Sequence, residues 1–197
     1  YKDEVRKIGS KLGLNDKLVM RHPFPGPGLS INVLCSGGKT SEKDKEEYAK
    51  ALNEIKNISI SLPVAEKSVL PVRSVGVQGD FRTYRFPAVL SFKETENGFY
   101  ELPNDWNAVE ETSSEITNNS DFMNRTILRL YQKPGAKLAV QEGYCDKGRL
   151  DQLREADNIV LTELHKSNWY NKIFQHLTID LPTLLQKTEP VLYCARL

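Results

Sequence analysis

The chain has 197 residues, enough to bury a hydrophobic core in one domain or in two small ones. Its 27 basic and 26 acidic side chains nearly cancel, and the formal charge of +1 excludes the strong basic field typical of nonspecific nucleic-acid or anionic-membrane binding. A content of 39% hydrophobic and 27% charged residues indicates a globular protein and excludes a disordered one.

The first predicted element is a helix that already contains the first residues. Apolar side chains recur at helical spacing from Val5 to Leu12, and Gly13 suits the end of the helix. A short helical turn to residue 20 follows. Because the chain opens inside a helix without an initiator methionine and closes on an apolar, strand-like run at 191–197, we expect it to be a piece of a larger protein.

A proline- and glycine-rich segment follows at residues 21–29, with the sequence RHPFPGPGL. Its three prolines remove backbone donors and fix φ, and its two glycines allow a positive φ or a close backbone approach. Neither a helix nor a central strand can pass through it. The segment is therefore either a stiff linker or a rigid loop that presents its backbone in one geometry.

The rest of the chain alternates between helix-like and strand-like patterns. Amphipathic helices are predicted at residues 39–55, 106–116 and 150–164. Strand-like runs are predicted at residues 29–35, 70–77, 81–84, 86–92, 126–131, 137–140, 173–181 and 190–197.

These elements predict an α+β fold, a small and mostly antiparallel sheet packed with helices. A weak internal repeat supports a duplicated subdomain. A helix, a Leu-Pro pair and strands occur at residues 39–92, and the same order begins again at 150–197. We expect the second copy to be incomplete.

Three stretches carry a resemblance to a known family. They are residues 21–29, residues 70–84 (LPVRSVGVQGDFRTY), and residues 153–157 (LREAD) with 172–175 (KIFQ) further on. In this order they resemble the C-terminal, dimerising and XMP-binding region of the glutamine-hydrolysing GMP synthases. Because the LREAD helix follows the LPVRSVGV strand, the order resembles the long, human-type enzyme with duplicated subdomains.

The resemblance implies a division of labour along the chain. Residues 1–20 would end an upstream ATP-pyrophosphatase domain, 21–29 would form the linker or substrate loop, 30–145 the first C-terminal subdomain, and 146–197 part of a second. The parent enzyme, a cytosolic carbon–nitrogen ligase, uses ATP, Mg²⁺ and ammonia freed from glutamine by a further domain to convert XMP to GMP. This region would supply XMP-pocket residues and homodimer contacts, would bind no cofactor, and would be inactive alone.

The candidate XMP-binding residues come from three places. The resemblance assigns the wall of the substrate pocket to the loop and further polar contacts to Asp80 and Gln175, while Arg82 is an electrostatic candidate for the phosphate. Each polar candidate has an alternative role: an Asx turn for Asp80, a solvated strand position for Arg82 and a structural hydrogen bond for Gln175. The loop candidates are His22, Phe24, Pro25, Gly26, Pro27 and Gly28.

Other chemistry finds little support. The three histidines and three cysteines have no metal-ligand spacing, no nucleophile signature is present, and we expect neither a catalytic residue nor a metal site in this chain. The odd cysteine number fits a reducing compartment, and no apolar run is long enough to predict a membrane span. The alternative function is a purely structural dimerisation or interaction module without nucleotide binding, and nucleic acid is not an expected partner.

Overall fold

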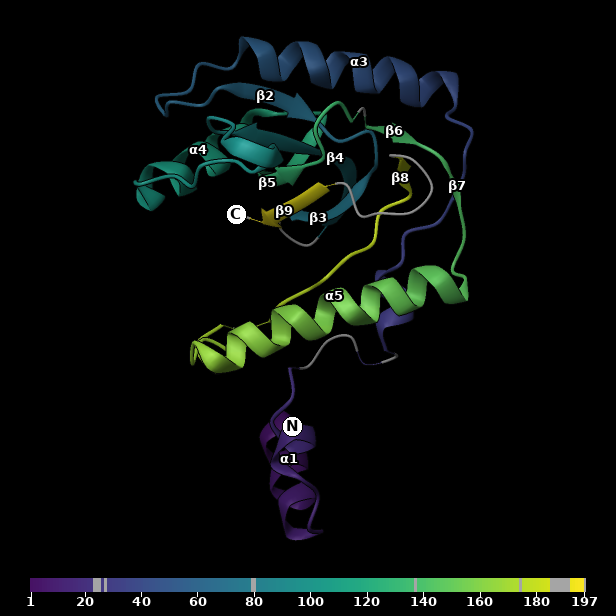
Figure 1. Cartoon of the computed structure of the whole chain (residues 1–197), viewed down its shortest axis with the longest axis vertical. Coiled ribbons are helices and arrows are strands. Elements are labelled where there is room, and N and C mark those ends of the chain that lie inside the picture. The colour runs from purple at the N-terminus through teal and green to yellow at the C-terminus, as the bar shows by residue number, and fades with distance from the viewer. Residues whose placement is uncertain are drawn as a thin grey trace. The chain divides into compact units, whose positions relative to one another are not determined.

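The computed structural model describes residues 1–22, 26, 28–78, 81–136, 138–173, 175–184 and 192–196 (Figure 1). The chain divides into two compact units, each built from two separated stretches. Unit 1 combines Tyr1–Cys35 with Gly143–Leu181, and unit 2 combines Ser36–Glu142 with Pro182–Leu197. The predicted α+β class is confirmed, while the predicted subdomain boundaries and the duplication stay predictions.

Unit 2 holds a five-stranded sheet in which β4 is the long central strand. One half of β4 pairs with β3 and the other half with β2, both antiparallel, while β5 runs parallel to β4 on its other side and β9 pairs antiparallel with β5. The predicted, mostly antiparallel sheet is therefore present. The strands are β2 (Glu66–Val69), β3 (Ser74–Gln78), β4 (Phe81–Ser91), β5 (Met123–Gln132) and β9 (Leu192–Arg196).

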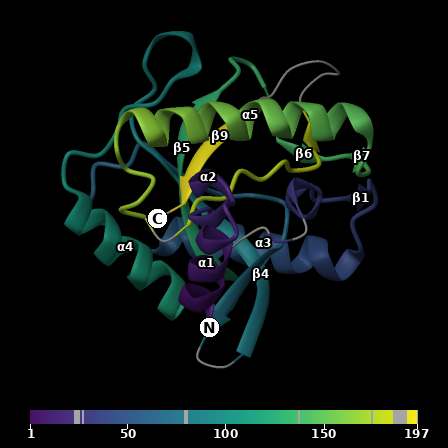
Figure 2. The same cartoon turned by 90° about the horizontal axis from the view of Figure 1, so that it is seen from below.

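The strand predicted at residues 70–77 is wrong in its bounds, because β2 ends at Val69 and β3 begins at Ser74. Pro71 lies in the interval, where it cannot donate a backbone hydrogen bond to a ladder. The two runs predicted after the turn are instead one strand, β4, whose register shifts between Phe86 and Pro87. Figure 2 shows the long strand β4 from a second direction.

Two helices, α3 (Glu42–Asn57) and α4 (Trp106–Asn119), cover one face of this sheet. Alternate residues of a strand share a face, and Phe86, Ala88 and Leu90 of β4 belong to one buried cluster with both helices. Trp106, at the start of α4, is 53% exposed. The cluster contains Ala51, Ile55, Val69, Phe86, Ala88, Leu90, Phe92, Val109, Ile116, Met123 and Leu128.

Short elements complete the structure. They are β1 (Ser36–Gly37), β6 (Ala139–Val140), β7 (Glu142–Gly143), β8 (Thr183–Leu184) and the 3-10 turn η2 (Glu96–Gly98). In the part of the chain that the structure describes, no helix is both long and apolar enough to cross a membrane.

Unit 1 contains α1 (Lys2–Lys11), α2 (Asp16–Val19), the 3-10 turn η1 (Leu29–Asn32) and the long helix α5 (Lys147–Lys166). The predicted helices at both ends of the unit are confirmed. Their starts follow the capping rules, since the Asp146 carboxylate accepts a hydrogen bond from the Arg149 backbone N–H at 2.9 Å.

Two strand predictions in unit 1 are wrong. Residues 29–35 begin as η1, because Gly28, with φ of 102°, turns the chain before it, and only Val33 forms a β-bridge, to Asp180. The run predicted at 173–181 has this bridge as its sole β pairing among its described residues. Apolar composition predicted both segments as strands. In the described residues the two segments pair with each other at one bridge, which is too little to form a ladder.

An ion cluster attaches the turn between β2 and β3 to helix α3. The Arg73 guanidinium donates to Asp44 Oδ1 at 2.5 and 2.9 Å and to Glu47 Oε2 at 2.5 Å, and it lies 4.7 Å from the Phe86 ring centre. The Ser41 hydroxyl and the Arg73 guanidinium hold the pKa of Asp44 below its ordinary value of 3.8. Arg73 likewise holds the pKa of Glu47 below 4.5.

This cluster predicts a specific loss of stability in acid. Carboxyl groups with a lowered pKa stabilise the fold above their ordinary values, and this contribution is lost as the pH falls through the lower folded values. We expect Arg73→Met to lower the Tm by about 2–4 °C at pH 7 and by less at pH 3, measured by circular dichroism. The exposed pair of Lys45 with Glu42 supplies the control Lys45→Met, which should change little. An equal loss at both pH values for Arg73→Met would contradict the assignment.

Candidate functional site

The start of the proline- and glycine-rich loop is fixed by Tyr170, which lies 148 positions further along the chain. The His22 backbone N–H donates to Tyr170 Oη at 3.0 Å, and His22 Nε2 donates to the Tyr170 backbone oxygen at 2.9 Å. The two rings stack with centres 4.1 Å apart and planes 4° apart. Backbone and side chain of His22 are therefore both held by one residue.

The other end of the loop is fixed by Asp180. The Asp180 backbone N–H donates to the Asn32 oxygen at 3.0 Å, and the Leu34 N–H donates to the Asp180 oxygen at 2.9 Å. Arg149 Nε donates to the Asp180 carboxylate at 2.7 Å, which attaches this point to α5. We call residues 23–28 the Pro-Gly loop and residues 170–180 the anchor segment. The anchor segment thus holds the chain on both sides of the Pro-Gly loop.

Two side chains of the anchor segment contact one carboxylate of α5. His176 Nε2 lies 3.3 Å from Asp157 Oδ1, and the Thr178 hydroxyl donates to the same oxygen at 2.9 Å. Both side chains therefore face α5, which carries Asp157. The intervening residue Leu177 is 36% exposed. The Gln175 side chain is half-buried and has no hydrogen bond to a described residue.

The structure brings part of the predicted site together in unit 1. His22, Gly28 and Gln175 lie on the loop ends and on the anchor segment, and Gly26 is exposed. Gly28 has φ of 102°, which favours glycine at this position. Phe24, Pro25 and Pro27 lie outside the described residues.

The remaining candidates belong to unit 2, at the hairpin of β3 and β4. Asp80 lies outside the described residues. Arg82 is exposed on β4 and pairs with Val77 across the hairpin. Within the described part of the chain its guanidinium forms no hydrogen bond or ion pair, unlike Arg73, Arg85 and Arg129. It therefore fits the solvated strand position that the sequence left open.

The hairpin is supported by Asn124 of β5, which explains the small residues of the LPVRSVGV motif. The Asn124 amide donates to the Ser74 oxygen at 2.9 Å and to the Thr83 oxygen at 3.2 Å, and it accepts from the Ser74 hydroxyl at 2.7 Å. A Cβ atom on Gly76 would lie 2.8 Å from Thr83 Oγ1 and 2.9 Å from Asn124 Cβ. The glycine is thus needed for the close approach of the amide.

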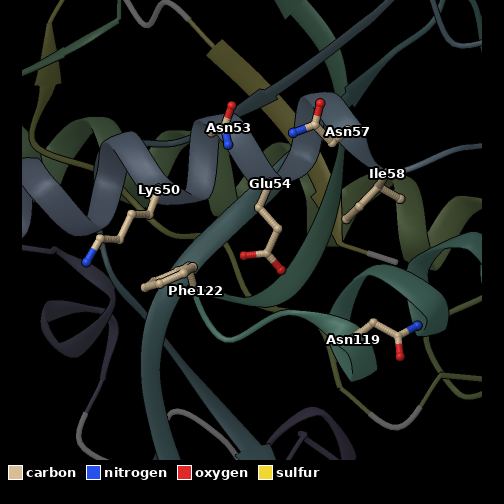
Figure 3. A pocket seen from close by; sticks show the side chains of 7 residues that line it. All are labelled: Lys50, Asn53, Glu54, Asn57, Ile58, Asn119 and Phe122. Atoms are coloured by element: carbon tan, nitrogen blue, oxygen red, sulfur yellow. The ribbon is translucent and has the colours of Figure 1, made fainter.

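Unit 2 also has an open hollow of about 510 Å³ between the ends of α3 and α4 (Figure 3). The single positive and single negative charge in its lining make it a poor phosphate site, and it contains none of the predicted residues. The lining residues are Lys50, Asn53, Glu54, Asn57, Ile58, Asn119 and Phe122.

The sequence did not point to several residues that build the site. Tyr170, Asp157 and His176 act through contacts between distant positions, which spacing does not reveal. Asn32 is 5% exposed and its amide nitrogen has no partner among the described residues; the only signal was a polar amide in an apolar run. Within the described chain, no three His, Cys, Asp or Glu side chains could hold a metal ion.

Comparison with known proteins tests the expected family. The chain is homologous to a region of the glutamine-hydrolysing GMP synthases, so the predicted resemblance is confirmed. No family model matches the chain.

The individual relatives show how much of each protein is matched. A probable GMP synthase of Leptospira interrogans is 37% identical over 184 residues, covering 92% of this chain and 28% of that protein. GMP synthases of Prochlorococcus marinus and of a Synechococcus strain are each 41% identical, covering 68% of this chain and 26% of those proteins. The chain therefore spans little more than a quarter of the length of these relatives.

The close packing around Gly76 predicts that one added methyl group at this position lowers the stability of the chain. We expect Gly76→Ala to destabilise the chain by about 1–3 kcal/mol in urea unfolding, because its Cβ would overlap the Thr83 and Asn124 side chains. Gly37→Ala, where no atom lies within 4 Å of the added Cβ, is the matched control. Equal stability of the two variants would show that the close approach is not required.

Proposed function

We propose that this chain is the C-terminal part of a GMP synthase, a carbon–nitrogen ligase that aminates XMP with ATP and glutamine-derived ammonia. In this proposal the chain supplies XMP-pocket residues and homodimer contacts. It works with ATP-pyrophosphatase and glutaminase domains of the same polypeptide, in the cytosol. ATP and Mg²⁺ belong to the parent enzyme, and no cofactor is bound by this part.

The observation that carries the proposal is the fixation of the Pro-Gly loop at both ends by the anchor segment. Hydrogen bonds from His22 to Tyr170 and between Asp180 and residues 32–34 hold the residues that flank a segment with three prolines. Loops that bind ligands are typically carried by flanks that the scaffold holds in place. Gln175 lies between the two attachment points.

The chemistry of XMP suits the residue types available. The nucleotide carries a phosphate that is largely dianionic at neutral pH, a ribose and a polar purine, so its site needs cations, backbone N–H groups and polar side chains. Arg82 offers a guanidinium that has no described partner. Gln175 offers a side-chain amide that has no hydrogen bond to a described residue. Asp80 supplies a carboxylate for donors on the ribose or the base. No residue of this chain needs to act as a nucleophile.

The second candidate function is a dimerisation or interaction module that binds no nucleotide. The exposed apolar side chains of α1 and of its C-cap favour it, since Val5, Ile8 and Leu12 are 57–75% exposed. Calorimetry with XMP distinguishes the two functions, because only the first requires nucleotide binding by this chain.

XMP binding should depend on the hairpin cation. We expect the chain to bind XMP in isothermal titration calorimetry and Arg82→Ala to weaken the affinity at least tenfold, about 1.4 kcal/mol. Asp80→Ala should also weaken it. Lys93→Ala removes the same charge from an exposed position beyond the other end of β4 and serves as the control. Absence of XMP binding by the unaltered chain would favour the interaction module.

The chain alone should not catalyse the reaction. With XMP, ATP, Mg²⁺ and ammonia we expect no GMP by liquid chromatography, since the proposal assigns ATP activation to another domain. GMP formation by the purified chain would overturn this part of the proposal. A complete GMP synthase under identical conditions is the positive control for the assay.

A further inference from the structure

The histidine nearest the Pro-Gly loop faces a second histidine. His22 Nδ1 and His176 Nδ1 lie 3.3 Å apart. On the far sides of the rings, His22 Nε2 contacts the Tyr170 carbonyl oxygen at 2.9 Å and His176 Nε2 lies 3.3 Å from Asp157 Oδ1. Both of these oxygens are acceptors when Asp157 is ionised, so each Nε2 must carry a hydrogen.

This arrangement fixes the number of protons on the two rings. A neutral imidazole has a single N–H, so two neutral rings donating through Nε2 would present two Nδ1 lone pairs to each other. With one additional proton, one ring donates an N–H to the other. With two additional protons, two N–H groups would oppose each other at the same short distance, and like charges would repel.

We propose that His22 and His176 share one proton between their Nδ1 atoms, and that this bond positions the two segments of unit 1 that carry candidate XMP ligands. Asp157 balances the added charge. His176 and Asp157 are then positioning residues, since they act on XMP through His22 and Gln175. The consequence for XMP rests on the proposed function, whereas the shared proton does not.

The surroundings favour a charge-assisted hydrogen bond over two independent imidazoles. The side chains of His176 and Asp157 are 16% and 12% exposed, so water screens the contact only weakly. The titratable groups facing the pair are the Asp157 carboxyl of α5 and the Tyr170 phenol. His165 of α5 reaches the pair through Tyr170, on which it stacks at 4.3 Å.

The position of the pair explains why it would act on the site. His22 immediately precedes the Pro-Gly loop, and His176 immediately follows Gln175. The pair therefore joins the residues that adjoin these two groups of candidate ligands. Loss of the shared proton at high pH, or gain of a second one at low pH, would remove this contact between the two segments.

The proton is tested directly by ¹⁵N NMR of the ring nitrogens between pH 5 and 9, without any ligand. The chain has three histidines, so single His→Gln variants assign all ring signals. We expect the His22 signals to move in two steps in the unaltered chain and in one step in His176→Gln. The control His165→Gln removes a stacked ring outside the Nδ1 contact and should preserve both steps. Identical His22 titrations in the unaltered chain and in His176→Gln would overturn the shared proton.

Two further variants separate the charge from packing. Asp157→Asn keeps the shape of the side chain and removes its charge, and we expect it to abolish the two-step titration. Thr178→Val removes the neutral hydrogen bond to the same carboxylate oxygen and should keep the two steps. Near-ultraviolet circular dichroism confirms that each variant is folded. A normal two-step titration in Asp157→Asn would show that the carboxylate does not support the pair.

The positioning role is tested by XMP affinity as a function of pH. We expect His176→Gln to bind XMP about tenfold more weakly near pH 7, with a smaller difference at pH 5, while His165→Gln matches the unaltered chain. The ratio of affinities cancels the titration of XMP itself. Equal affinities of His176→Gln and the unaltered chain across the range would overturn the positioning role. If the unaltered chain binds no XMP, the proposed function fails, and the NMR result still decides the shared proton.

Discussion

The contact between His22 and Tyr170 is the constraint on which the arrangement of unit 1 depends. It joins positions 148 residues apart through two hydrogen bonds and a ring stack, and it fixes where the Pro-Gly loop begins. Prolines restrict the loop internally, but they cannot decide where its ends lie. The positions of the loop ends are determined by the anchor segment, which also holds the chain at Asp180.

The hairpin of unit 2 is also held by a residue distant in the sequence, through a side-chain amide. Its strands are held by the side-chain amide of Asn124, which contacts Ser74 and Thr83 on the two strands, and by a glycine that leaves room for it. Arg73 attaches the preceding turn to α3 through two carboxylates. Much of the LPVRSVGV motif therefore supports the hairpin.

The sequence was sufficient for features that depend on neighbouring residues. The helices and the α+β class follow from local periodicity, as with α5, which is predicted at 150–164 and observed at Lys147–Lys166. The sequence was insufficient where contacts between distant residues determine the secondary structure. Residues 29–35 and 173–181 are apolar enough for strands, yet each finds only a bridge, between Val33 and Asp180. The His22–His176 contact and the Asn124 support cross long sequence separations, so no spacing rule reveals them.

The discontinuity of unit 1 has a consequence for the order in which the chain folds. During synthesis, the stretch Ser36–Glu142, with α3, α4 and most of the sheet, is complete before Tyr170 and Asp180 have been made. Unit 1 therefore cannot form until Tyr170 and Asp180 have been synthesised. Its contacts then close a chain segment of nearly 150 residues. Contacts between such distant positions are slow to form, so the paired stretches of unit 1 are among the last described parts of the protein to come together.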